Sequence, residues 1–174
     1  YQKTFGVIGT GAIGTKVALI AKAFGCHVIA YSRTKREAVS EAGITYVSLE
    51  ELLKQSDIIS IHVPLNDATK AMIGKKEIEL MKKSAIVLNT ARGGVVDSQA
   101  LAEALNTEKI AGAGIDVFEM EPPVPNNHPL VGAKHTVLTP HVAFASDEAL
   151  YTRAIIVFDN IINWEMGTPQ NVIV

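Results

Sequence analysis

The sequence lacks several features that would place it in a class at once. Its single cysteine, Cys26, excludes a disulfide within these 174 residues and a cysteine-rich zinc site. Acidic and basic residues nearly balance, with a formal net charge of −2, so charge gives no reason to expect a nucleic-acid or membrane partner. There is no run of about 18 apolar residues and no signal-peptide pattern at the start. We therefore expect a cytoplasmic protein that binds neither nucleic acid nor a membrane.

The hydrophobic content, 48%, is enough for a domain of this length to bury a core. Short apolar runs alternate with amphipathic stretches, and several of the runs are apolar on both faces. This alternation predicts an α/β fold, a doubly wound parallel sheet of the Rossmann type, with strand order 3-2-1-4-5-6 and a seventh strand at one edge. The expected strands are 5–8, 28–31, 45–47, 58–63, 85–89, 113–117 and 137–138.

Capping residues mark the expected helix ends. Gly25 is placed to end the first helix. Thr34 to Glu37 and Ser48 to Glu51 each have the spacing of a capping box, in which a hydroxyl is followed three residues later by a glutamate. Asp97 and Ser146 are placed to cap two further helices, of which the second is long and closes the chain.

The motif "GTGAIG" fills the turn from the first strand to the first helix. Gly9 permits a tight turn, Gly11 lets the backbone approach a pyrophosphate, and Gly14 lets the helix pack close to the strand. The amide groups of Ala12 and Ile13 would then face the anion at the helix start. Because the motif follows an apolar strand and opens a helix, it predicts a dinucleotide site and not merely a flexible turn.

The second strand ends in "YSRTKRE", where an NAD site would often have an acidic residue. Ser32 occupies that position and can donate a hydrogen bond to a phosphate, and Arg33 can meet the same phosphate with a planar charged fork. Thr34 follows them at the edge of the same site. These residues predict NADP(H) as the preferred cofactor, with NAD(H) as a possible one. For Lys35 and Arg36, exposure to solvent at a helix start is the simpler interpretation.

Three later stretches each place a polar side chain after a predicted strand. Arg92 lies in "VLNTARGGVVD", Asp116 and Glu121 in "AGAGIDVFEMEPP", and His141 in "LTPHVAFAS". Taken singly, each is more often a surface charge or a structural histidine than a catalyst. If the strands are parallel, however, their carboxyl ends meet at one edge of the sheet, where ligands bind in open α/β folds.

These motifs resemble the nucleotide-binding domain of the D-isomer-specific 2-hydroxyacid dehydrogenases, from about Lys3 to the end of the chain. The glycine turn, "NTARGG", "DVFEMEPP" and "TPHVAF" occur in the order and spacing of that family. The resemblance implies that Arg92 binds the carboxylate and carbonyl oxygen of the substrate. It also implies that His141 is the acid/base and that Glu121 pairs with His141.

The resemblance further implies a set of residues along the cofactor. Asp116 matches the family position near the nicotinamide carboxamide. The remaining positions implied are Thr90 and Ala91 and, within "HVPLNDAT", His62, Val63, Pro64 and Thr69. For the four histidines other than His141 a structural role is expected, although His62 has a plausible place near the cofactor; these four are His27, His62, His128 and His135. No pair of them has metal-ligand spacing with acidic neighbours, so we predict no metal.

The chain departs from the family in lacking a substrate domain. We expect residues 1–166 to form the dinucleotide-binding domain and 167–174 to be a tail that belongs to the absent domain. Alone, such a fragment should be inactive. In the full protein, the resemblance implies a homodimer that acts on a small 2-hydroxy or 2-oxo acid, with hydroxypyruvate or glyoxylate favoured by likeness to glycerate dehydrogenases and hydroxypyruvate reductases. A non-enzymatic NAD(P)(H)-sensing protein of the corepressor kind, or a free-standing regulatory module, remains the alternative.

Overall fold

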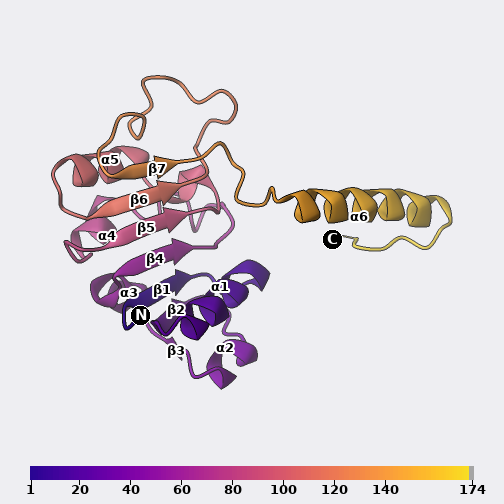
Figure 1. The fold of residues 1–174 in the computed structure, drawn as a ribbon, viewed down its shortest axis with the longest axis horizontal. Coiled ribbons are helices and arrows are strands. Elements are labelled where there is room, and N and C mark those ends of the chain that lie inside the picture. Colours follow the sequence, from indigo (N-terminus) through magenta and orange to yellow (C-terminus); the bar gives the residue numbers. More distant parts are fainter. Residues whose placement is uncertain (173–174) are drawn as a thin grey trace. The chain divides into compact units, whose positions relative to one another are not determined.

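The computed structural model describes residues 1–172, and its chain divides into two units (Figure 1). The first unit runs from Tyr1 to Pro140 and contains the sheet, and the second begins at His141 and is built around one helix. The predicted boundary after residue 166 stays a prediction. Residues 173 and 174 of the predicted tail lie outside the described residues.

The first unit is built on a seven-stranded sheet with the order β3-β2-β1-β4-β5-β6-β7, and every neighbouring pair is parallel. This confirms the predicted doubly wound topology and the position of the seventh strand at an edge. The observed strands are β1 (Thr4–Ile8), β2 (His27–Tyr31), β3 (Thr45–Tyr46), β4 (Ile58–Ile61), β5 (Ile86–Asn89), β6 (Gly112–Ile115) and β7 (Thr136–Leu138).

Helices cover both faces of this sheet, because successive strand residues point into two separate hydrophobic clusters. In β1, Val7 belongs to the cluster beneath α1, and its neighbour Ile8 belongs to the larger cluster that includes Leu53 of α3 and Leu101 of α5. The helical segments of this unit are α1 (Ala12–Ala23), α2 (Glu37–Glu41), α3 (Leu49–Gln55), α4 (Lys75–Glu79), the 3₁₀ turn η1 (Gly93–Val95) and α5 (Ser98–Asn106).

Most of the predicted helix caps are present. Ser48 and Glu51 form a reciprocal capping box, in which the Ser48 hydroxyl accepts from the Glu51 amide and the Glu51 carboxylate accepts from the Ser48 amide, both at 3.2 Å. Asp97 accepts hydrogen bonds from the amides of Gln99 and Ala100, both at 3.0 Å. Gly25 ends α1 in a left-handed conformation, with φ +79°.

The predicted cap at Thr34 is wrong. Helix α2 begins three residues later, at Glu37, and its N-cap is Arg36, which provides no side-chain cap. The reason is a contact distant in sequence: the Arg36 amide donates to the hydroxyl of Tyr46 at 2.9 Å, and Arg36 remains extended. The turn between β2 and α2 is therefore longer than the sequence pattern indicated.

The second unit consists of α6 (Asp147–Glu165) and its flanking residues. The Ser146 hydroxyl caps α6 as predicted, accepting from the Ala149 amide at 3.2 Å. After the helix, Asn171 donates to the side chain of Asn160 at 2.9 Å, so the described part of the tail returns along α6. Within residues 1–172, no helix has the length and apolar character needed to cross a membrane.

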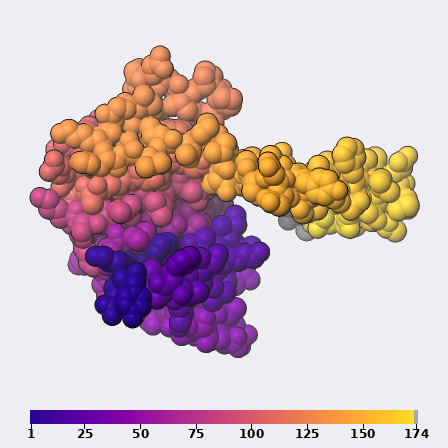
Figure 2. All heavy atoms as spheres, in the orientation of Figure 1, coloured from indigo at the N-terminus to yellow at the C-terminus, as the bar shows by residue number. Residues whose placement is uncertain are grey.

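The long connection between β6 and β7 projects from the first unit (Figure 2). It begins with Asp116 and contains Glu121 and His128, and it has no helix or strand of its own. Its anchoring therefore depends on side-chain contacts, which are described below.

The cap at Asp97 provides a test of the fold near the turn that carries Arg92. Asp97→Ala should lower the free energy of unfolding by about 1 kcal/mol, because two amides at the start of α5 lose their acceptor. Asp97→Asn keeps a side-chain oxygen and should lose only a few tenths of that amount. Urea titrations of both variants measure the difference, and equal losses would contradict the capping role.

Candidate functional site

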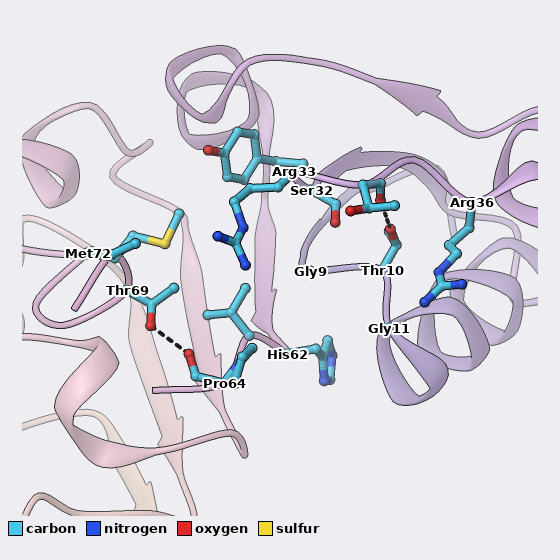
Figure 3. A pocket seen from close by; sticks show the side chains of 14 residues that line it. Gly9, Thr10, Gly11, Ser32, Arg33, Arg36, His62, Pro64, Thr69 and Met72 are labelled. Carbon is cyan, nitrogen blue, oxygen red and sulfur yellow. Dashed lines mark hydrogen bonds between the residues drawn. The ribbon is translucent and has the colours of Figure 1, made fainter. Parts of the chain in front are cut away.

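A cavity of about 230 Å³ lies at the carboxyl ends of β1, β2 and β4 (Figure 3). It is bounded by the turns that follow these strands, which meet at one edge because the strands are parallel. All fourteen residues that line it come from three stretches of chain, 9–11, 31–36 and 62–72, and Tyr31 is the only one of them that lies in a strand. The residues predicted to bind cofactor that line it are Gly9, Gly11, Ser32, Arg33, Thr34, His62, Val63, Pro64 and Thr69.

The glycine turn has the geometry that a dinucleotide needs. Gly9 has φ +91°, a conformation that side chains disfavour, and a Cβ on Gly14 would lie 1.9 Å from the Gly9 carbonyl oxygen. A Cβ on Gly11, in contrast, would meet nothing within 4 Å, so the turn is open on the side where a ligand could approach. Helix α1 begins there with exposed Ala12 and Ile13 and without a side-chain cap, which leaves its first amides for an anion.

The turn after β2 makes one wall of the cavity cationic. Arg33 and Arg36 both line it, and Figure 3 shows Arg36 on the side of Gly11 and Arg33 on the side of Thr69. The interpretation of Arg36 as a purely solvent-facing residue is therefore incomplete. No carboxylate belongs to the set of described residues that line the cavity.

The segment after β4 forms the opposite wall. The His62 ring shares a hydrogen bond of 2.8 Å with the Ser60 hydroxyl, and burial lowers the pKa of His62, which favours the neutral imidazole at pH 7. The Thr69 hydroxyl donates to the Pro64 carbonyl at 2.5 Å and accepts from the Asn66 amide at 2.9 Å. Thr69 thus holds this loop in shape in addition to lining the cavity.

The turn after β5 carries Thr90, Ala91 and Arg92 and is organised by one buried side chain. Asn89, only 1% exposed, accepts from the Ala91 amide and donates to the Arg92 carbonyl, both at 3.1 Å. Arg92 is exposed, and its guanidinium donates to the Ala91 carbonyl at 2.6 Å. The guanidinium of Arg92 therefore lies exposed at the edge of the sheet, and the side chain of Asn89 fixes the backbone of its turn.

Two acidic residues follow the neighbouring strand β6. Asp116 is 3% exposed, accepts from the Thr139 hydroxyl at 2.5 Å and donates its own amide to the Asn89 carbonyl at 3.0 Å. Glu121 is exposed, and its carboxylate accepts from the Phe118 amide. Arg92, Asp116 and Glu121 therefore come from connections at the same edge of the sheet, as the sequence predicted.

His141 opens the second unit. Its backbone has φ +56°, and its ring lies edge-on to Phe144, with the centroids 6.1 Å apart. Its pairing with Glu121 stays a prediction. No group of three or more His, Cys, Asp or Glu side chains among residues 1–172 could hold a metal ion.

Sequence reasoning did not foresee a pair formed by Glu119 and His128. His128 is 8% exposed, and its Nε2 lies 2.9 Å from a Glu119 oxygen. Burial acts to raise the pKa of Glu119, but hydrogen bonds from Ser98 and His128 outweigh it and hold the pKa below its usual value. No sequence pattern indicates this pair, because it depends on how the loop between the two residues closes.

Known proteins share this fold and much of this sequence. The glyoxylate reductase of Aeropyrum pernix is 49% identical over 173 residues, which are 98% of this chain and 51% of that protein. The hydroxypyruvate reductase of Blautia hydrogenotrophica is 40% identical over 171 residues, or 98% of this chain and 53% of that protein. This chain thus spans about half the length of the curated relatives it matches.

Solved structures of related enzymes have the same fold. The pyruvate reductase of Chlamydomonas reinhardtii superposes with a TM-score of 0.91 at 37% identity, over 98% of this chain and 56% of that one. The acyclic imino acid reductase Bsp5, in complex with NADPH and D-Arg, gives 0.87 at 37% identity, over 99% and 54%. The sequence profile of the NAD-binding domain of the D-isomer-specific 2-hydroxyacid dehydrogenases matches residues 1–143. The chain therefore belongs to the D-isomer-specific 2-hydroxyacid dehydrogenase family, of which it contains the NAD-binding domain.

Proposed function

We propose that the protein containing this chain transfers a hydride between a nicotinamide cofactor and a small D-2-hydroxy acid or the matching 2-oxo acid. The observation that carries this proposal is the shared sheet edge, where the glycine turn, Arg92, Asp116 and Glu121 follow parallel strands of one sheet. We favour hydroxypyruvate or glyoxylate as the substrate, because relatives at 49% and 40% identity are named glyoxylate reductase and hydroxypyruvate reductase.

Each proposed role matches the chemistry of its side chain. The bound nicotinamide would supply or accept the hydride. Arg92, always charged, would grip the substrate carboxylate through two parallel hydrogen bonds. His141 would give the carbonyl oxygen its proton during reduction, because imidazole changes charge near neutral pH. Glu121 would pair with His141 and stabilise the imidazolium.

The cofactor end of the site supports NADP(H) as the preferred cofactor. A 2′-phosphate needs cations and hydrogen-bond donors, and the wall formed by Ser32, Arg33 and Arg36 has them without any carboxylate among the described lining residues. The neutral state of His62 leaves the two arginines as the cationic side chains of this cavity. Asp116, Thr90, Ala91, Ala12 and Ile13 do not line this cavity, and we retain them as proposed contacts of the rest of the dinucleotide.

We also propose a cytoplasmic homodimer that binds neither nucleic acid nor a membrane and needs no metal. Light scattering of the intact protein would measure its oligomeric state. The named relatives are reductases and dehydrogenases, which does not favour the alternative of a non-enzymatic sensor.

Turnover is the first test. The intact protein should reduce hydroxypyruvate or glyoxylate with NADPH in a spectrophotometric assay, whereas this chain alone should bind cofactor without turnover because it spans about half of its relatives. Cofactor binding by the intact protein without turnover of any small 2-oxo acid would reject the enzyme and leave the sensing role.

Arg92 is tested by substitution. Losing one charge-assisted hydrogen bond costs about 1.5 to 3 kcal/mol, so Arg92→Gln should lower kcat/KM for the 2-oxo acid at least roughly 10- to 150-fold. Arg92→Lys keeps the charge but not the fork and should recover only part of the loss. As a matched control, Lys83→Gln removes an exposed cation before β5, at the amino end of the sheet, and should leave kcat/KM unchanged. An Arg92→Gln variant as active as this control would exclude the proposed role.

Cofactor preference is tested by titrating NADPH and NADH into this chain. Arg33→Ala should weaken NADPH roughly 10- to 150-fold and NADH little, because only NADPH offers the phosphate. Ser32→Asp should shift preference toward NADH by repelling the phosphate and accepting from the ribose.

Lys35→Ala is the matched control for this titration. Lys35 lies over the ring of Tyr46, 5.8 Å from its centroid, and does not line the cavity, so NADPH affinity should hardly change.

The NADPH advantage of the wild type should shrink as the salt concentration rises, since exposed charges are screened over about 10 Å at about 0.1 M. Equal affinity of the wild type for both cofactors would reject the assignment.

A further inference from the structure

His128 is a buried histidine that the proposed chemistry does not use. It lies in the connection between β6 and β7, which has no regular structure and projects from the first unit (Figure 2). Burying an imidazole is unfavourable unless its polar atoms are paired, and both ring nitrogens of His128 have partners.

The partners determine which tautomer is present. The Leu130 amide donates to Nδ1 of His128 at 3.3 Å, so Nδ1 must be an acceptor without a proton. Nε2 then carries the proton and donates it to the Glu119 carboxylate at 2.9 Å. The other oxygen of that carboxylate accepts from the Ser98 hydroxyl at 2.6 Å. His128 is therefore a neutral donor in a chain of hydrogen bonds that ends at the start of α5.

These bonds close a loop around Glu121. Glu119 and His128 stand nine positions apart, and their contact joins the two ends of the loop in which Glu121 lies. His128 also contacts Phe118, whose ring lies edge-on to the imidazole with the centroids 5.2 Å apart. The backbone amide of Phe118 is the group that donates to the Glu121 carboxylate. His128 thus contacts Phe118 and Glu119, the segment of chain that leads to Glu121.

The same segment is locked to the turn that carries Arg92. A Cβ on Gly93 would lie 2.0 Å from the Phe118 carbonyl carbon and 2.4 Å from the Glu119 amide nitrogen, so the two backbones are in direct contact. Ser98 lies just beyond this turn, at the first position of α5. The cluster of Ser98, Glu119 and His128 therefore links the loop of Glu121 to the turn of Arg92 by side chains as well as by backbone packing.

We propose that His128 is a positioning residue: through Glu119, Ser98 and Phe118 it holds the base of the 119–128 loop so that Glu121 is presented at the sheet edge beside Arg92. The proposal rests on the proposed function, in which Glu121 supports the acid/base. It predicts that the hydrogen bond from Nε2 to Glu119, more than the bulk of the ring, is what the reaction needs.

Two variants of His128 distinguish the roles of its two ring nitrogens. His128→Gln can reach Glu119 with an amide donor near the position of Nε2, whereas His128→Asn keeps an acceptor near Nδ1 and loses the donor. In the intact protein, His128→Asn should lower kcat about 10- to 100-fold, since small misplacements of a catalytic group have effects of that size. His128→Gln should recover most of kcat. Cofactor affinity should stay unchanged in both, because the cavity that includes Arg33 is lined by none of these residues.

The matched control is His135→Asn, the same substitution at an exposed histidine of the same connection. His135 has φ +55°, a conformation that Asn tolerates well, so kcat and stability should not change. A general loss of folding would lower cofactor affinity and kcat together, and it would not be relieved by Gln at position 128. That pattern would reject a positioning role.

Amide hydrogen exchange on the intact protein is the second readout and does not depend on turnover. His128→Asn should speed exchange in residues 118–128 about tenfold and leave β1 and β4 unchanged, because these strands lie outside the cluster. Unchanged exchange would overturn the proposal, and so would faster exchange with a wild-type kcat. If the wild type itself has no turnover, the proposed function fails and this role fails with it, while the exchange data still show whether His128 anchors the loop.

Discussion

Parallel pairing of the strands is the constraint on which the rest of the structure depends. When every neighbour in the sheet runs in one direction, the connection after each strand must leave from the same edge. Turns separated by many residues, such as those at Gly11 and Ser32, are therefore neighbours in space through the sheet alone, and the turn at Arg92 leaves from the same edge. No long loop has to bring them together, and short turns of small and polar residues are sufficient.

The order of the strands could be predicted because its determinants are local. Strands apolar on both faces, short helices with clear caps and right-handed crossovers leave few alternatives, and the glycine turn identifies the first strand. The features that escaped prediction depend on partners distant in sequence or on loop closure. Thr34 fails as a cap because the Tyr46 hydroxyl takes the Arg36 amide, and no pattern around Thr34 contains that information. His128 is buried because the chain returns to Glu119, which composition cannot show.

In the candidate site, too, the sequence predicted where the polar residues lie but not the contacts that hold them. Residue types at the ends of strands predicted Arg92, Asp116 and Glu121 at one edge, since position in the sheet decides it. Their support could not be predicted: Asn89 holds the turn of Arg92 with both ends of its amide, and Thr139 holds Asp116 with a hydroxyl. Such supporting contacts depend on backbone geometry to within a few tenths of an ångström, which residue type alone does not specify.

The turn after β2 and the connections after β5 and β6 lie at different places along the sheet edge, so substitutions can affect them separately. The cationic wall formed by Ser32, Arg33 and Arg36 lies on the turn after β2. The cluster around Arg92 and Glu121 is built on the connections after β5 and β6, and none of the described residues that line the cavity belongs to those connections. Substitutions in one group need not disturb the other, because effects of distant sites without common partners add independently. Substitutions on the turn after β2 can therefore change the charge of the cavity wall, while the connections after β5 and β6 keep the contacts that hold Arg92 and Glu121.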